Sequence, residues 1–152
     1  MKYEVYAGIK VTDDFSVFEF TSTGKKGAIQ KRIVFTETEI DKVFNLAFGD
    51  VDNDDEINDY SISDNGDRNK ILATVAKIIE DYTNKYPDRW IFFKGSTNER
   101  TRLYRMAVGL HFEELSAKFE IFAYMDEQLF PFAKNLKTNA FLVKRKMFKF
   151  VK

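Results

Sequence analysis

One corner of this sequence has the residue types and spacing expected of an anion-binding site. An apolar run at residues 90–93 stops at a glycine turn, and polar capping residues then open a helix at Glu99. Such a turn leaves backbone N–H groups pointing outward, which favours a negative charge, and an arginine adds a bidentate fork. The predicted ligand-binding residues are Gly95, Ser96, Thr97 and Arg100, with Asp64 and Asn65 from the turn before an earlier helix.

The same residues also fit an ordinary capped helix in which Arg100 pairs with a carboxylate such as Asp64 or Asp67. The spacing of a nucleotide P-loop and the GxGxxG pattern are both absent from the sequence. On a helical wheel Arg100 projects toward the sheet, whereas Arg102 and Arg105 point roughly the other way. The sequence therefore favours Arg100 over the other two arginines as the ligand contact.

Residues 50–67 hold eight acids and no Lys or Arg. Asp50, Asp52 and Asp54 are spaced like the first three calcium ligands of an EF-hand, but the turn glycine and the final bidentate Glu are missing. A solvated acidic loop is the simpler interpretation. The candidate metal ligands are Asp50, Asp52 and Asp59, with Mg²⁺ or Ca²⁺ as the candidate ion.

Composition excludes several classes of chemistry. There is no Cys and a single His, so disulfides, thiolate zinc sites and multi-histidine metal sites cannot form within one chain. No GxSxG motif is present, and no serine has a histidine at a recognisable spacing. No segment approaches the ~20 apolar residues of a membrane helix, and the start has no apolar signal core, so we expect a cytoplasmic protein without a membrane partner.

The hydrophobic pattern predicts an α+β fold in a single domain, residues 1–152. One apolar face from Ile71 to Tyr82 predicts a helix, and a second helix runs from Glu99 to Leu115. We expect an antiparallel sheet of about six or seven strands with the two main helices packed on one face. The predicted strands are residues 3–10, 15–20, 29–36, 43–48, 90–93, 119–125 and 140–146. A brief strand is also considered at 61–63, and the apolar segment 129–132, which contains Pro131, is interpreted as an edge strand or an irregular segment.

Residues 134–152 hold seven bases and no acid, so charge is separated along a chain whose formal net charge is zero. The basic segment could pair with the acidic loop of its own chain or of a neighbouring copy. Its alternating lysines and aromatics could also contact nucleic acid, although an edge strand guarded by lysines has the same pattern.

Several segments together resemble a family of uncharacterised bacterial single-domain proteins, a domain of unknown function. These segments are Asn45–Asp50, Ser63–Asp67, Leu72–Ala76, Gly95–Thr97, Arg100–Met106 and Ala140–Lys146. The resemblance implies one domain of about this length, and it implies no activity, ligand or catalytic residue.

The residues themselves favour a small binding module for an anionic ligand, either a phosphate-bearing small molecule such as a nucleotide or a nucleic acid. One alternative is a Mg²⁺-dependent enzyme that acts on phosphate esters through Asp50, Asp59, Asp64 and Asp67 opposite Arg100. The other is a protein-interaction component without a small-molecule site. The oligomeric state is left open.

Overall fold

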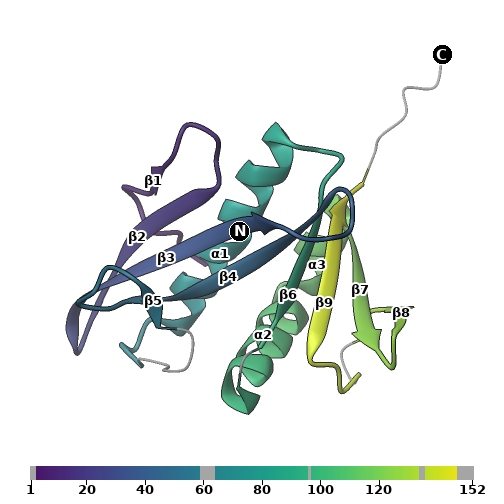
Figure 1. Ribbon diagram of the computed structural model, residues 1–152. Coiled ribbons are helices and arrows are strands. Elements are labelled where there is room, and N and C mark those ends of the chain that lie inside the picture. The colour runs from purple at the N-terminus through teal and green to yellow at the C-terminus, as the bar shows by residue number, and fades with distance from the viewer. Residues whose placement is uncertain (1–2, 59–63, 96, 134–135, 147–152) are drawn as a thin grey trace.

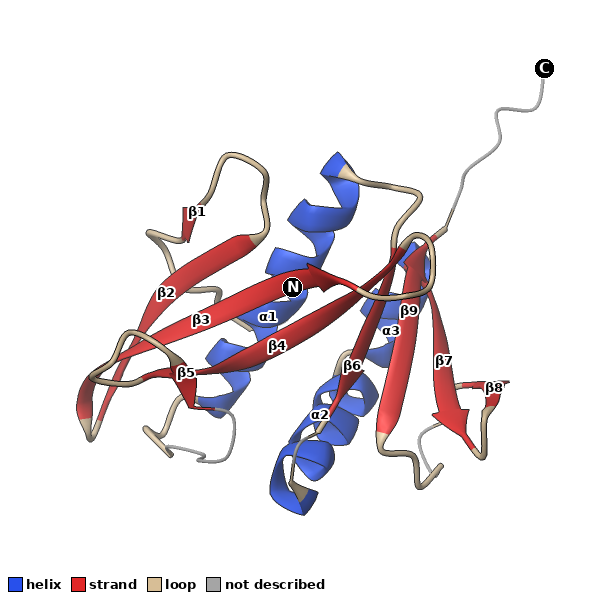
Figure 2. Ribbon diagram, viewed as in Figure 1, coloured by secondary structure: helices blue, strands red, loops and turns tan. Residues whose placement is uncertain are grey.

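The computed structural model describes residues 3–58, 64–95, 97–133 and 136–146, which form one sheet of nine strands and three helices (Figures 1 and 2). The strands are β1 (Lys10–Val11), β2 (Val17–Gly24), β3 (Gly27–Glu37), β4 (Val43–Val51), β5 (Ile57–Asn58), β6 (Trp90–Lys94), β7 (Phe119–Met125), β8 (Gln128–Pro131) and β9 (Ala140–Arg145). The helices are α1 (Arg68–Lys85), α2 (Asn98–Leu110) and α3 (Phe112–Lys118).

The strand order is β1-β2-β3-β4-β6-β9-β7-β8, with β5 paired beside β4. All neighbours are antiparallel except β4 and β6, which pair in parallel with Val43 opposite Trp90. The prediction of a wholly antiparallel sheet was therefore wrong at one place. The cause is α1, because a helix that crosses between two adjacent strands returns the chain in its original direction.

The structure also has more strands than the sequence predicted. The additional strand β5 has two residues, too few to show a clear alternation. The strand β8 overlaps the segment 129–132, which the sequence left open between an edge strand and an irregular segment. The predicted strand at residues 3–10 is reduced to β1, because Tyr6 instead donates its backbone N–H to the Thr74 hydroxyl of α1 over 2.9 Å. The brief strand considered at residues 61–63 falls outside the described residues.

The hydrophobic core lies between the helices and one face of the sheet, where aromatic rings from both layers meet. Tyr82 of α1 stacks on Phe35 of β3 at 3.8 Å between ring centroids, and Tyr104 of α2 meets Phe93 of β6 at 5.5 Å. The helices lie behind the sheet in Figure 2, and in that view no described helix covers the front face. The described helices include none that is long and apolar enough to cross a membrane.

Both predicted helices are present, with one difference in the second. The first extends a few residues beyond the predicted range Ile71–Tyr82, and its apolar face is buried. The second was predicted to continue to Leu115, but it ends at Leu110, and α3 begins after His111. The backbone of His111 (φ −104°, ψ 14°) leaves the helical region there, which redirects the chain toward β7.

Candidate functional site

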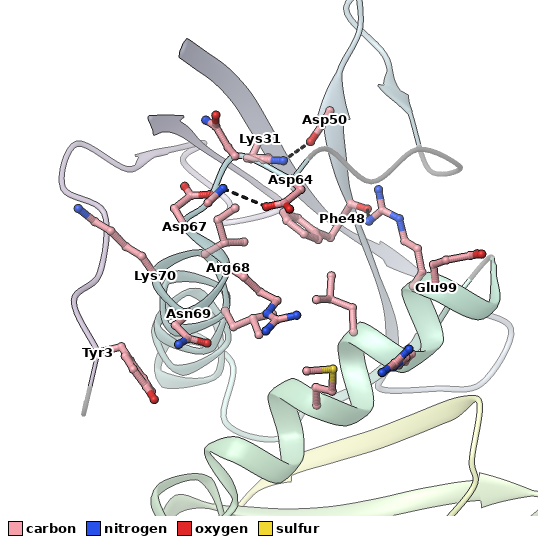
Figure 3. A pocket seen from close by; sticks show the side chains of 18 of the residues that line it. Tyr3, Lys31, Phe48, Asp50, Asp64, Asp67, Arg68, Asn69, Lys70 and Glu99 are labelled. Atoms are coloured by element: carbon pink, nitrogen blue, oxygen red, sulfur yellow. Dashed lines mark hydrogen bonds and ion pairs between the residues drawn. The ribbon is translucent and has the colours of Figure 1, made fainter. Parts of the chain in front are cut away.

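A large cavity lies between the first turns of α1 and α2, above the helix-covered face of the sheet, and has a volume of about 1040 Å³ (Figure 3). A second hollow of about 620 Å³ continues along the same two helices toward Leu136 and Lys137. Five residues line both: Arg68, Asn69, Leu72, Arg102 and Met106. We call the two together the helix groove, with an upper section near β4 and a lower section near Lys137.

The upper section brings together several residues that the sequence singled out. Asp50, Asp64, Asn65 and Arg100 all line it, as does Asp67. Gly95, Thr97 and Asp52 do not. Ser96 and Asp59 lie outside the part of the chain that the structure describes.

Arg100 reaches this cavity with its guanidinium engaged by the protein. The side chain is only 2% exposed. Its Nη1 donates to the carbonyl oxygen of Phe48 over 2.6 Å, and its Nη2 donates to the carbonyl oxygen of Asn58 over 3.2 Å. The guanidinium thus joins α2 to the adjoining strands β4 and β5, a structural role, and its predicted role as the ligand contact gains no support.

Gly95 and Thr97 shape the start of α2. A Cβ on Gly95 would lie 2.3 Å from the backbone nitrogen of Thr101, so glycine is needed for this close approach. The Thr97 hydroxyl accepts the backbone N–H of Arg100 over 3.2 Å, which confirms the predicted capping of this helix. Both residues therefore have a packing or capping reason to be present that needs no bound anion.

Asn65 and Asp64 hold the turn before α1. Asn65 is 2% exposed, and its side-chain NH₂ donates to the Ser22 hydroxyl over 3.1 Å and to the carbonyl oxygen of Gly27 over 2.9 Å. Its amide oxygen accepts the backbone N–H of Lys26 over 2.6 Å, so it fixes the β2–β3 hairpin. Asp64 is exposed; the backbone N–H of Gly66 and, to a lesser extent, the charge of Lys25 lower its pKa.

Two acids of the upper section, Asp50 and Asp67, have partners within the protein. Asp50 forms an ion pair with the buried Lys31, and Asp67 accepts hydrogen bonds from the hydroxyls of Tyr6 and Ser22. Figure 3 shows the pair of Lys31 and Asp50 at the edge of the cavity.

The acidic loop forms a hairpin between β4 and β5 rather than a helix–loop–helix motif. Asp52 accepts the backbone N–H groups of Asp54 and Glu56 over 2.9 and 3.0 Å, and Arg32 of β3 binds the carboxylate of Asp55 over 2.6 Å. Over the described ranges, no group of three or more His, Cys, Asp or Glu side chains could hold a metal ion.

The lower section of the groove contains cations for which the sequence predicted no ligand contact. Its charged lining residues are Arg68, Arg102, Arg105 and Lys137, and no acidic residue of the described chain lines it. Within the same described part, the side chains of these four cations form no hydrogen bond or ion pair. In Figure 3, Arg68 extends from the start of α1 into the space between the two helices.

Apolar side chains line the lower section between these cations. Leu72, Met106, Leu110 and Leu136 line it, and Met106 and Leu110 are 40% and 45% exposed. Gly109 faces the same space, and a Cβ built there would meet no atom within 4 Å. The result is an apolar surface bordered by cations from both helices.

Two sequence signals could have identified this section. The first turn of α1 contains Arg68 and Lys70 and no acid, although the positive end of a helix favours acids. On α2, Arg102, Met106 and Gly109 follow at spacings of four and three residues, so they form one stripe. Arg102 and Arg105 point away from the sheet, as the helical wheel predicts, and residues with that direction can line a groove between two helices.

The sequence profile of one protein family, described as a family of unknown function (DUF6934), matches residues 2–146. No curated protein and no solved structure gives a significant match to the chain.

Proposed function

The chain belongs to this family of unknown function, DUF6934, and we propose from its own residues that it binds a phosphate-bearing anionic ligand in the helix groove. The observation that carries the proposal is the set of four cations in the lower section, Arg68, Arg102, Arg105 and Lys137, without an internal acidic partner in the described chain. The kind of ligand agrees with the expectation from sequence. The residues that we propose to hold it are different.

The contrast with other cations of the protein supports this assignment. Lys31, Arg32 and Lys118 each bind a carboxylate of the chain. Placing like charges together without counter-charges destabilises a fold. The concentration of arginines in one groove is therefore better explained by an external anion than by stability.

The chemistry of the groove favours phosphate among anions. Guanidinium groups bind phosphate through two parallel hydrogen bonds, and arginine is less strongly hydrated than lysine. The apolar side chains of Leu72, Met106 and Leu110 lie beside these cations. They also offer a surface for an apolar part of the ligand, such as a nucleobase.

We do not extend the proposal to a metal-dependent reaction. Asp50 and Asp67 are engaged with Lys31 and with the hydroxyls of Tyr6 and Ser22. The carboxylate of Asp64 accepts the backbone N–H of Gly66 in the same turn. Binding alone accounts for the residues that line the groove.

The experiment measures binding of ATP and of inorganic pyrophosphate by titration calorimetry, using Gly109 as the site of change. The open space at Gly109 accepts a side chain without a clash. Gly109→Glu places a negative charge beside the arginines and is expected to weaken binding by about tenfold or more. Gly109→Gln, which has the same size and no charge, should retain most of the affinity.

Ala117→Glu is the control for the added charge, because Ala117 is exposed on α3 and does not line the groove. Its affinity should equal that of the unmodified protein. Equal affinities for Gly109→Glu and the unmodified protein, or no measurable binding of either probe, would refute the proposal.

A further inference from the structure

The face of the sheet opposite the helices carries a cluster of aromatic side chains on β6 and β7. Cross-strand partners share a face, and the register places Phe92, Leu142 and Phe122 in one row across β6, β9 and β7. Trp90 and Tyr124 lie on the same face because they are two residues from Phe92 and Phe122. We call Trp90, Phe92, Phe122 and Tyr124 the aromatic face.

The four rings form two diagonal pairs above the middle strand β9. The centroids of Trp90 and Phe122 lie 5.9 Å apart at 37°, and those of Phe92 and Tyr124 lie 6.2 Å apart at 81°. Because β6 and β7 flank β9, their backbones are about 10 Å apart, so the rings lean toward each other over Leu142. Their outward sides stay open: Tyr124 is 38% exposed and the other three are half-buried.

Lysines lie at both ends of the aromatic face. Lys94 follows at one end of β6, while Lys144 and Lys146 lie toward the other end, with the Nζ of Lys144 5.5 Å from the centre of the Trp90 ring. Glu120 of β7 lies opposite Lys144 and carries a negative charge on the same face of the sheet. The aromatic face therefore presents more positive than negative charge.

The charges and rings of the aromatic face favour one kind of bound molecule over another. A second copy of the chain would bring the lysines of two such faces together without enough acids to match them. A single-stranded nucleic acid offers flat bases for the rings and phosphates for the lysines, which is the combination that sheet-based binders of single strands use.

We propose that the aromatic face binds single-stranded nucleic acid, with unpaired bases stacked on Trp90, Phe92, Phe122 and Tyr124 and with the phosphates near the lysines. This site is separate from the helix groove, because the sheet lies between them (Figure 2). It does not depend on the function proposed for the groove.

The test uses Trp90, the only tryptophan of the chain, whose fluorescence reports on this face. Titration with a short oligothymidylate should quench this fluorescence, and the affinity should fall as salt is added. The double variant Phe92→Leu with Tyr124→Leu keeps apolar side chains and removes two stacking rings, so its affinity should fall by tenfold or more. Leu129→Ala is the control, since Leu129 is exposed opposite Tyr124 and carries no ring.

A second comparison separates the two sites. Arg102→Gln with Arg105→Gln removes cations of the groove and should leave the oligothymidylate quenching unchanged. The proposal is overturned if the fluorescence does not respond, or if the leucine variant binds as tightly as the Leu129→Ala control. It is also overturned if only the arginine variant loses binding, or if Trp90 responds to protein concentration in place of oligothymidylate, which would identify the face as a self-association surface.

Discussion

Arg100 and Phe48 are joined by a 2.6 Å hydrogen bond from the guanidinium Nη1 to a backbone carbonyl oxygen. The bond connects the first turn of α2 to β4. The central carbon of the same guanidinium lies 5.6 Å from the centre of the Phe48 ring. A cation held in this way positions two elements that border the helix groove. Its contribution is expected to appear in the stability of the fold.

Arg100→Gln should therefore lower the free energy of unfolding by about 1–3 kcal/mol, because the carbonyl oxygens of Phe48 and Asn58 lose the guanidinium as a donor, the first of them in a buried position. Chemical denaturation measures the change. Arg102→Gln, an exposed position on the same helix, should stay within about 0.5 kcal/mol of the unmodified protein. Equal stability of the two variants would show that the contacts of Arg100 do not matter for folding.

The two glycines at 95 and 109 should respond in opposite directions to alanine. Gly95→Ala forces a Cβ to 2.3 Å from the backbone of Thr101 and is expected to cost about 1–3 kcal/mol. Gly109→Ala, in open space within α2, should stabilise the protein by about 0.5–1 kcal/mol. Thermal unfolding of both variants tests this, and destabilisation by Gly109→Ala would contradict the open groove.

The parts of the fold with a strong periodic pattern could be predicted from sequence. The strand at Phe119–Met125 agrees with its prediction to the residue, and α1 contains the predicted face from Ile71 to Tyr82. Pairing between distant strands has no local signal, so the parallel contact of β4 with β6 could not be read from the pattern.

For the site, the sequence grouped residues that the structure also brings together, while the role of Arg100 as a ligand contact stays a prediction. Asp50, Asp64 and Arg100 line one cavity, as their proposed grouping required. The sequence could not show that carbonyl groups of Phe48 and Asn58 would occupy the guanidinium of Arg100. Such partners belong to strands 52 and 42 residues away in sequence, and only the tertiary structure brings them close.

Asn65 is expected to be a stability residue of the β2–β3 hairpin. Asn65→Ala removes three hydrogen bonds, to Ser22, Lys26 and Gly27, and should cost about 2–3 kcal/mol by leaving buried polar groups without partners. Amide hydrogen exchange should accelerate in the hairpin. Asp64→Ala, at the exposed neighbouring position, should have a much smaller effect, and similar losses for the two variants would argue against this role.

Asp14 should contribute to the acid sensitivity of the fold. The Ser16 hydroxyl and backbone N–H, together with the Thr12 hydroxyl, lower the pKa of Asp14 from 3.8 to about 2. Because the folded pKa lies below the unfolded one, this stabilisation is present above about pH 4 and is lost as the pH falls toward 2. Asp14→Asn should flatten stability against pH in that window, and an unchanged slope would contradict the assignment.

Arg68 should show opposite effects on stability and on binding. It occupies the first turn of α1, where the positive end of the helix disfavours a cation, and its side chain has no ion pair within the described chain. Arg68→Gln should therefore stabilise the fold by about 0.3–1 kcal/mol at low ionic strength, an effect that salt reduces. The same variant should bind pyrophosphate more weakly, since one of the groove cations is gone. Thermal unfolding with and without pyrophosphate measures both, because a ligand that binds the native state raises the melting temperature.

Lys10→Gln, which removes an exposed cation outside the groove, should change neither quantity. A variant at Arg68 that loses stability, or that keeps the full pyrophosphate shift, would mean that this arginine serves the fold and not a ligand.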